Sequence, residues 1–434
     1  MRSTSSSAEP PAPDPAADVA LRVDHLFRHR SGQMVSTLTR VLGFDNLDLV
    51  EDAVQEALVQ ALRRWPFSGV PENPTAWLIQ VAKHRALDTL RRRGTWRQKQ
   101  QQLESALRAT GREAGGMRPG FAGELPDDQL RMIFACCRPE LSRDAQVALT
   151  LKTVGGFSVP ELGRAFLVQT ATMAQRLLRA KQRLRQAGAE LEIPAPPDLP
   201  ARLDAVLEVV YLMFNEGYSP GEGETAVRLD LCSEAIRLAE LLVEHPLTGA
   251  PRACALSSLL LFQGSRLAAR ADPAGELLLL PEQDRSLWDR GLIARGVQRL
   301  GLAGRGDELS AYHLQAEIAA CHATAATTEA TDWPHILACY DALLRLSPSP
   351  VVALNRAVAL ARVEGPQAGL AALEALDGHR ELRSYYPAHA TRGQLLAELG
   401  RNEAARASFR RALELTSSAP VRRLCERRCA ELAG

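Results

Sequence analysis

The sequence is poor in aromatic residues, has no long apolar run and carries almost no net charge. Aromatic residues make up 5% of the 434 positions, and the formal charge is +1. Few aromatic and β-branched residues argue against a β fold. No uninterrupted apolar segment approaches the ~18–20 residues needed to cross a bilayer, so the sequence predicts no membrane association. It also lacks the apolar core of a secretion signal, and we expect a cytoplasmic protein.

The cysteines do not follow a zinc-binding pattern. There are eight, without the paired CxxC spacing of structural zinc sites. Cys136 and Cys137 are adjacent, and the others lie inside apolar helical patterns. The sequence therefore predicts reduced core thiols, no metal and no cofactor.

Catalytic motifs are also missing. The nine histidines are scattered, and the sequence contains no P-loop, no HExxH and no GxSxG. His84 is the one histidine beside a motif, where a solvent-facing or phosphate-contacting role suits it better than catalysis. We expect no catalytic residue and no enzymatic activity.

What the sequence does contain is a helical pattern with an uneven distribution of charge. Leu, Ala, Arg and Glu are abundant and apolar residues recur near a period of 3.6, which predicts an all-α fold. Residues 1–193 carry about +6 and the remainder about −5, although the sum is close to zero. Such a division between halves is typical of a nucleic-acid-binding surface on one side.

Composition divides the chain into six segments. A Ser- and Pro-rich stretch, residues 1–20, has too few apolar residues to pack and is predicted to be disordered. Two helical blocks, 21–105 and 128–192, are separated by a Gly-rich, flexible linker at 106–127. A Pro-rich and therefore stiffer linker, 193–202, leads into a long helical domain, 203–434.

The long helical domain contains weak internal repeats. ILACYDALLRLSP (Ile336–Pro348) and AARASFRRALEL (Ala404–Leu415) share the spacing of the second helix of a tetratricopeptide hairpin, with Tyr340 and Phe409 as the matching aromatics. Their separation is close to two repeats of ~34 residues, and GLAALEAL (Gly369–Leu376) falls between them. Such arrays form a concave binding face that would suit a protein or small-molecule partner. Irregular helical packing without a binding role is the alternative.

The segment Phe157–Arg185 has the pattern of a helix-turn-helix. Ser158 and Glu161 fit a capping box, the chain turns through Leu167–Gln169, and Thr170 is placed to cap the second helix. Apolar residues of that helix form one stripe: Met173, Leu177, Ala180 and Leu184. Polar and cationic residues remain outside: Gln175, Arg176, Arg179, Lys181, Arg183 and Arg185. A basic face that is merely solvated is the alternative to DNA binding.

The first block predicts two more functional helices. In Leu47–Pro66, an apolar face consists of Val50, Val54, Leu58, Leu62 and Trp65. Another face is acidic and amidic, with Asp52, Gln55, Glu56 and Val59, and suits a basic protein partner. In Thr75–Lys99, cations gather toward one end with Trp77 and Trp96 between them, as in proteins that bind unpaired bases, although core packing also explains Trp77.

These motifs together resemble a known family. DAVQEALVQALRRW, NPTAWLIQVAKHRALDTLRRR and the helix ending RLLRAKQRLR resemble regions two and four of a bacterial sigma factor of the extracytoplasmic-function class. The order and the spacing also match. LEVVYLMFNEGYSPGEGE (Leu207–Glu224) resembles a subgroup with a long C-terminal, tetratricopeptide-like extension.

The resemblance implies partners and site residues. Core RNA polymerase would be bound through Asp52, Gln55 and Glu56. The promoter −10 element would be handled by about Ser68–Thr75 and by the helix that carries Trp77, Lys83, Arg85, Arg91, Arg92 and Arg93. The −35 element would be bound by Thr172, Ala174, Gln175, Arg176, Leu178, Arg179 and Lys181. Ala174 and Leu178 offer no hydrogen bonds, so base readout there would depend on Gln175, thymine methyl groups and DNA shape.

Two further hypotheses concern the whole chain. We expect the acidic C-terminal domain to control the basic half through the stiff linker, with FNEGYSPG (Phe214–Gly221) either a docking surface or a plain turn. The alternative function is a helix-turn-helix transcriptional regulator whose helical-repeat domain binds a ligand or protein. That alternative gives no role to the Asp52–Glu56 stripe or to the basic Trp77–Arg93 helix.

Overall fold

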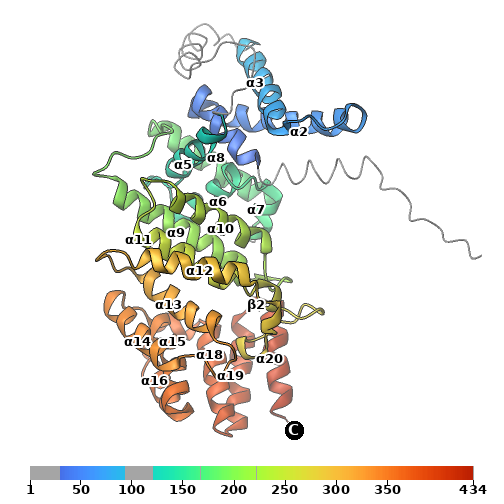
Figure 1. The fold of residues 1–434 in the computed structure, drawn as a ribbon. Coiled ribbons are helices and arrows are strands. Elements are labelled where there is room, and N and C mark those ends of the chain that lie inside the picture. The colour runs from blue at the N-terminus through green and yellow to red at the C-terminus, as the bar shows by residue number, and fades with distance from the viewer. Residues whose placement is uncertain (1–29, 93–120, 167, 221, 434) are drawn as a thin grey trace, which may run out of the picture. The chain divides into compact units, whose positions relative to one another are not determined.

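The computed structural model describes residues 30–92, 121–166, 168–220 and 222–433. The predicted tail at 1–20, residues 106–120 of the predicted flexible linker, and Arg93 lie outside these ranges. The prediction of an all-α fold is confirmed, since the regular secondary structure of the described residues is helical apart from two strands of two residues each (Figure 1). No described helix is both long and apolar enough to span a bilayer.

The chain divides into two compact units, residues 1–202 and 203–434. In the first unit residues 30–42 are helical. The named elements that follow are η1 (Phe44–Asn46), α2 (Leu47–Ser68), α3 (Pro74–Arg92), α5 (Phe121–Cys136), α6 (Arg143–Thr153), α7 (Val159–Ala165) and α8 (Thr170–Gln186). Helix α5 begins at Phe121, so the predicted linker extended too far at its C-terminal end.

The second unit begins inside α9 (Leu199–Tyr218), so the predicted Pro-rich linker ends before residue 202. Helices α10 (Leu229–Glu244), α11 (Pro251–Gly264), α12 (Arg290–Ala303) and α13 (Ala311–Thr324) follow, with short 3-10 turns η2 (Leu267–Ala269), η3 (Leu280–Glu282) and η4 (Arg285–Leu287). The last helices are α14 (Trp333–Leu346), α15 (Pro350–Glu364), α16 (Pro366–Glu374), α17 (Arg380–Arg383), α18 (Tyr386–Glu398), α19 (Asn402–Leu415) and α20 (Ala419–Glu431) (Figure 1).

A short parallel pairing connects the two ends of the second unit. Strand β1 (Glu222–Gly223) pairs with β2 (Ser417–Ser418), with Glu222 opposite Ser417. Three helix pairs follow one another along the chain: α13–α14, α15–α16 and α18–α19. Within each pair the two helices pack against each other. Tyr340 lies on α14 and Phe409 on α19, where the Phe409 ring is buried against Gly393 of α18.

Apolar stripes of α3 and α8 lie in the first unit's core. The stripe Met173, Leu177, Ala180 and Leu184 is buried, as are Leu78, Ala82, Ala86 and Leu90 of α3. Leu62 was wrongly placed in the core and is 43% exposed. Steps of four residues rotate a position by about 40° each, so Leu62 lies about 120° from Val50 around α2. Ala61 and Trp65 take its place in the core.

Two aromatic residues of the segment Phe214–Pro220 pack inside the second unit. Phe214 is buried and stacks on Tyr218, with ring centroids 5.6 Å apart. The Arg270 guanidinium lies over the Tyr218 ring at 3.7 Å from its centroid, a close cation–π contact. These two aromatic side chains therefore serve internal packing, which favours the plain-turn interpretation over a docking surface.

Candidate nucleic-acid interface

Helix α2 presents a polar stripe to solvent. Asp52, Gln55 and Glu56 are all exposed, while Val54, Ala57 and Leu58 between and beside them are buried. Glu56 forms an exposed ion pair with Arg85 of α3, at 3.1 Å. The sequence alone gave Glu56 no partner, so this pair is a correction. The pair leaves the stripe accessible, because both of its side chains are about half exposed.

Helix α3 carries the cations predicted to contact DNA. Arg91 and Arg92 are exposed at its C-terminal end, while Lys83 and Arg85 are partly buried. Trp77 is also partly buried and meets Trp65 of α2 edge to face, with centroids 5.5 Å apart. The core-packing interpretation of Trp77 therefore accounts for its position. Asn73 caps the helix, its Oδ1 accepting from the backbone N–H of Ala76 at 3.1 Å.

The last turn of α2 exposes an aromatic residue that the motifs in the sequence did not single out. Phe67 is 92% exposed at the end of α2, directly before Ser68 and Gly69, which has φ +77°. A solvent-facing phenyl ring beside a cationic helix can stack on an unpaired base. The sequence indicates this exposure, because Phe67 follows Pro66 and does not fall on the periodic apolar face of the helix.

Helices α7 and α8 form the predicted hairpin. The capping box is present: Ser158 N–H donates to Glu161 Oε2 at 2.7 Å, and Glu161 N–H donates to Ser158 Oγ at 3.3 Å. A Cβ on Gly163 would lie 3.0 Å from the Val168 carbonyl oxygen, so a side chain there would crowd the turn. The predicted cap at Thr170 is wrong, because Thr170 is the first helical residue and Gln169 precedes the helix.

Most of the residues predicted to contact the −35 element are exposed on α8. They are Thr172, Ala174, Gln175, Arg176, Leu178 and Arg179. Leu178 is a large apolar side chain that is about half exposed, as expected for a group that meets a partner. Gln175 Oε1 accepts a weak hydrogen bond from Arg179 Nη2 at 3.4 Å, so both side chains extend from the same face.

Three arginines of α8 line a pocket of about 300 Å³ beside the N-terminus of α6. The pocket contains Arg176, Arg179 and Arg183, together with Leu141, Ser142 and Asp144. The first backbone N–H groups of a helix favour an anion, and three guanidinium groups add positive charge. The three guanidinium groups outnumber the one Asp144 carboxylate, so the pocket suits an anion such as a phosphate group. Arg183 belongs to it, although it was not among the residues assigned from the sequence.

Lys181 is placed differently from its neighbours on α8. Its Nζ donates to Asp48 Oδ1 at 2.7 Å and to Glu51 Oε2 at 2.9 Å, and its side chain is only 7% exposed. Arg185 Nη2 donates to Asp48 Oδ2 at 2.5 Å. The prediction that Lys181 faces DNA phosphates therefore does not fit this arrangement, in which α2 carboxylates neutralise it.

The charges of this cluster stabilise one another. Burial acts to raise the pKa of Asp48, but hydrogen bonds from Arg185 and Lys181 outweigh it and hold that pKa below its ordinary value. Burial acts to lower the pKa of Lys181, but the carboxylates of Glu51 and Asp48 outweigh it and raise that pKa above its ordinary value. Lys181 therefore remains an ammonium, and the cluster is a charged bridge between α2 and α8.

Two further contacts join the first helical block to the second. Arg40 Nε lies 2.7 Å from Asp128 Oδ1, which is almost fully buried. Gly32 approaches the Val154 carbonyl group so closely that a Cβ would overlap it. The two blocks, predicted as separate, therefore pack together within one unit.

The fold and these surfaces define a class of protein: an all-α protein with cationic helical faces suited to a polyanion, and an exposed acidic and amidic stripe suited to a protein. Comparison with known proteins agrees with this. Residues 26–95 match the sigma-70 region 2 family, and residues 202–304 match a family of unknown function, DUF6596. An uncharacterized protein of Rhizobium meliloti (strain 1021) is 45% identical over 377 residues, which cover 87% of this chain and 88% of that protein.

The chain therefore belongs to one family with the Rhizobium meliloti protein, with which it shares nearly its whole length, and its residues 26–95 are similar to sigma-70 region 2. The match to sigma-70 region 2 indicates a role in transcription initiation. The matched region contains α2, α3 and the turn with Phe67.

Proposed function

We propose that the chain is a sigma factor of the extracytoplasmic-function class, which binds core RNA polymerase and directs it to promoters. The exposed stripe of α2 binds a polymerase subunit, and the turn with Phe67 and helix α3 handle the melted −10 element. Hairpin α7–α8 acts as the helix-turn-helix that binds the −35 element. The chemistry of bond formation belongs to the polymerase, so the chain needs no catalytic group of its own.

The observation that carries this proposal is the conjunction of two surfaces in one unit. The sigma-70 region 2 match covers a helix with an exposed Asp52, Gln55 and Glu56 stripe. In the same unit, α8 supplies the arginine pocket beside the α6 N-terminus. A protein that only bound DNA would need the second surface but not the first.

Run-off transcription on a selected promoter library tests the function. The full chain with core RNA polymerase should yield transcripts that neither component yields alone. Footprinting separates this function from a helix-turn-helix regulator, because a regulator protects its site without polymerase. Protection of DNA by the chain alone, with no stimulation of transcription, would overturn the proposal.

Base readout and phosphate binding on α8 should be separable by mutation. Arg176→Ala and Arg179→Ala should weaken promoter binding about equally on all sequences and flatten the salt dependence by about one phosphate contact each. Gln175→Ala should relax selectivity at one −35 position, with a cost of about 1–3 kcal/mol if its contact is bidentate. Binding of holoenzyme to single-substitution promoters at several salt concentrations measures both effects.

Lys181→Met is the matched comparison on the same helix. Because Lys181 is paired with Asp48 and Glu51, its loss should leave the salt slope of promoter binding nearly unchanged and lower the thermal stability of the first unit instead. A uniform loss of affinity from Gln175→Ala would remove that side chain from base readout.

We also propose that the second unit, a helical domain of the tetratricopeptide-like kind, controls the sigma regions. The ordered pairs α13–α14, α15–α16 and α18–α19, with Tyr340 and Phe409 on second helices, support this assignment. Stacked hairpins provide an extended face for a protein or small-molecule partner. The opposite net charges of the two halves, about +6 and about −5, favour their attraction.

A further inference from the structure

Helices α13 and α14 bring three metal-binding side chains to one point. Glu317 lies on α13, and His335 and Cys339 lie on α14. One ligand atom from each lies within 4.8 Å of the other two. Among the described residues, no other group of three or more His, Cys, Asp and Glu side chains meets this condition.

Spacing within α14 explains how two of these ligands converge. His335 and Cys339 are four residues apart and therefore lie on the same face, one turn from each other. Glu317 approaches them from the facing helix. Ile318 and Ile336, each directly after a ligand, pack in one apolar cluster that also contains Cys339. This cluster fixes the two helices with the three ligands directed at one another.

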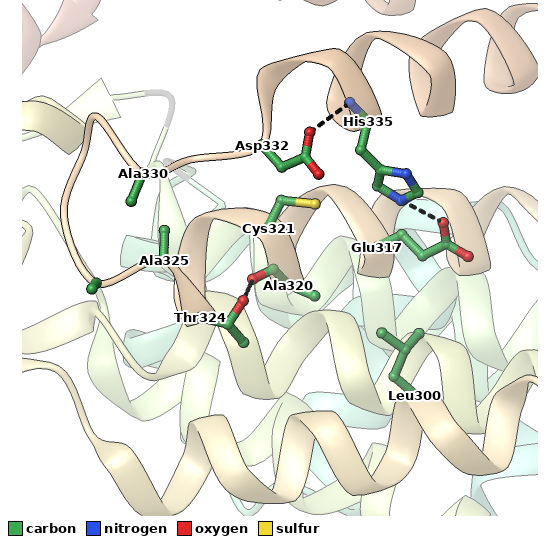
Figure 2. Close-up of a pocket in the computed structure, with 10 residues that line it drawn as sticks. Leu300, Glu317, Ala320, Cys321, Thr324, Ala325, Ala330, Asp332 and His335 are labelled. Carbon is green, nitrogen blue, oxygen red and sulfur yellow. Dashed lines mark hydrogen bonds and ion pairs between the residues drawn. The ribbon is translucent and has the colours of Figure 1, made fainter.

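The start of α14 is also fixed. Asp332 Oδ1 accepts from the backbone N–H of His335 at 3.0 Å and caps the helix (Figure 2). The cap sets where α14 begins, and so sets the rotation of the helix that places His335 opposite Glu317. Figure 2 shows His335 reaching across to the Glu317 carboxylate.

Two of the three ligand-to-ligand distances match those of a tetrahedral metal site, and the third, between His335 Nε2 and Cys339 Sγ, is within 4.8 Å. His335 Nε2 lies 3.2 Å from Glu317 Oε2, and Cys339 Sγ lies 3.4 Å from the same oxygen. With bonds of about 2.0–2.1 Å to nitrogen or oxygen and about 2.3 Å to sulfur, neighbouring ligands of a tetrahedral zinc ion are about 3.3–3.5 Å apart. The side chains can thus hold such an ion without moving the helices.

The ligand types select the class of metal. A thiolate and an imidazole favour zinc-like transition cations over Mg²⁺ and Ca²⁺, which prefer oxygen ligands alone. The Cys339 thiol donates to Glu317 Oε2, so a cation must displace the thiol proton to bind.

Access to the site is open on one side. Glu317 and His335 line an open pocket of about 500 Å³ that also includes Cys321, Asp332 and Thr324 (Figure 2). Three protein ligands with a solvent-facing fourth position are the arrangement of exchangeable zinc sites, as opposed to closed structural ones. We propose that Glu317, His335 and Cys339 form a binding site for a zinc-like divalent cation, with its fourth position open to the pocket.

Cobalt titration of the full-length protein tests the site, since Co²⁺ reports its ligands by absorption and Zn²⁺ does not. One equivalent of Co²⁺ should bind with the thiolate-to-cobalt charge-transfer band, and Zn²⁺ should abolish the band by displacement. His335→Ala removes an exposed side chain and should weaken Co²⁺ binding by at least about tenfold to hundredfold. Cys339→Ser should remove the charge-transfer band.

The chain supplies a matched control. Cys425 and Cys429 on α20 have the same spacing of four residues, but no His or carboxylate in the described part of the chain completes a cluster with them. Cys429→Ser should leave the band and the affinity unchanged. Circular dichroism shows whether each variant is folded, and the exposed position of His335 keeps the test open if Cys339→Ser unfolds. Each of three results would overturn the proposal. Co²⁺ could bind without the charge-transfer band, the affinity for Co²⁺ could be unchanged in His335→Ala, or Co²⁺ binding could be lost in Cys429→Ser.

Discussion

Simultaneous replacement of Asp52, Gln55 and Glu56 by Ala is expected to weaken binding to core RNA polymerase by at least about hundredfold. All three side chains are exposed on one face of α2, within the region that matches sigma-70 region 2. A hundredfold loss corresponds to about 2.8 kcal/mol, and truncation of a single hot-spot residue at the centre of an interface costs about 2 kcal/mol or more. Titration of core polymerase against a labelled chain measures the loss.

The fold should survive this change. The Glu56–Arg85 pair is exposed on both sides, and such pairs contribute about 0–1 kcal/mol. Glu190→Ala, which removes an exposed carboxylate that follows α8, serves as the control and should bind polymerase normally. If the folded triple variant bound core polymerase as the unchanged chain does, α2 would not be the polymerase-binding element.

Helical periodicity predicted the local structure of the first unit well. Burial of Met173, Leu177, Ala180 and Leu184 follows from their spacing, because one face of a helix that packs on a core must be apolar. The capping box at Ser158 was predicted for a similar reason, since its two hydrogen bonds join residues only three apart. Leu62 was misplaced because a run of four-residue steps rotates gradually away from the buried face.

Contacts between distant segments could not be predicted in this way. Lys181 and Glu51 are 130 positions apart, and nothing in the spacing of either helix indicates that they meet. The sequence pattern gave Lys181 a phosphate-facing role, because a lysine on the polar side of a basic helix is ordinarily solvated. Its neutralisation by Asp48 and Glu51 depends on how the two blocks pack, which is a tertiary property.

The cluster of Glu317, His335 and Cys339 was missed for a related reason. The cysteines were compared with CxxC spacing, in which a short loop brings two ligands together. On a helix the corresponding signal is a separation of four residues, which His335 and Cys339 have. That spacing alone is common in helices, and the third ligand becomes visible only when α13 and α14 are placed face to face.

Removal of the second unit is expected to abolish run-off transcription while leaving a folded sigma half. The chain is cut after Arg202, because Arg202 Nη2 donates to the Phe134 carbonyl group at 2.5 Å within the first unit and an earlier cut would remove that contact. Residues Leu203–Gly434 form a compact unit of their own that is larger than masking one helix would require. We therefore expect this domain to hold the sigma regions in the geometry that polymerase needs, and a tether makes weak attraction effective.

Three measurements on the truncated chain make this prediction decisive: its thermal melting, its transcription activity, and the salt dependence of its promoter binding. If the truncated chain melts cooperatively but has lost its transcription activity, the second unit is needed to hold the sigma regions in their active geometry. Partial rescue of activity by adding the second unit as a separate chain would support this further, because a tether raises only the effective concentration. Gained activity would mean instead that the acidic domain masks the arginines of α8, and the salt dependence should then steepen as phosphate contacts become free. A truncated chain with unchanged activity and unchanged salt dependence would exclude both forms of control, and the net negative charge of the second unit would then need another partner.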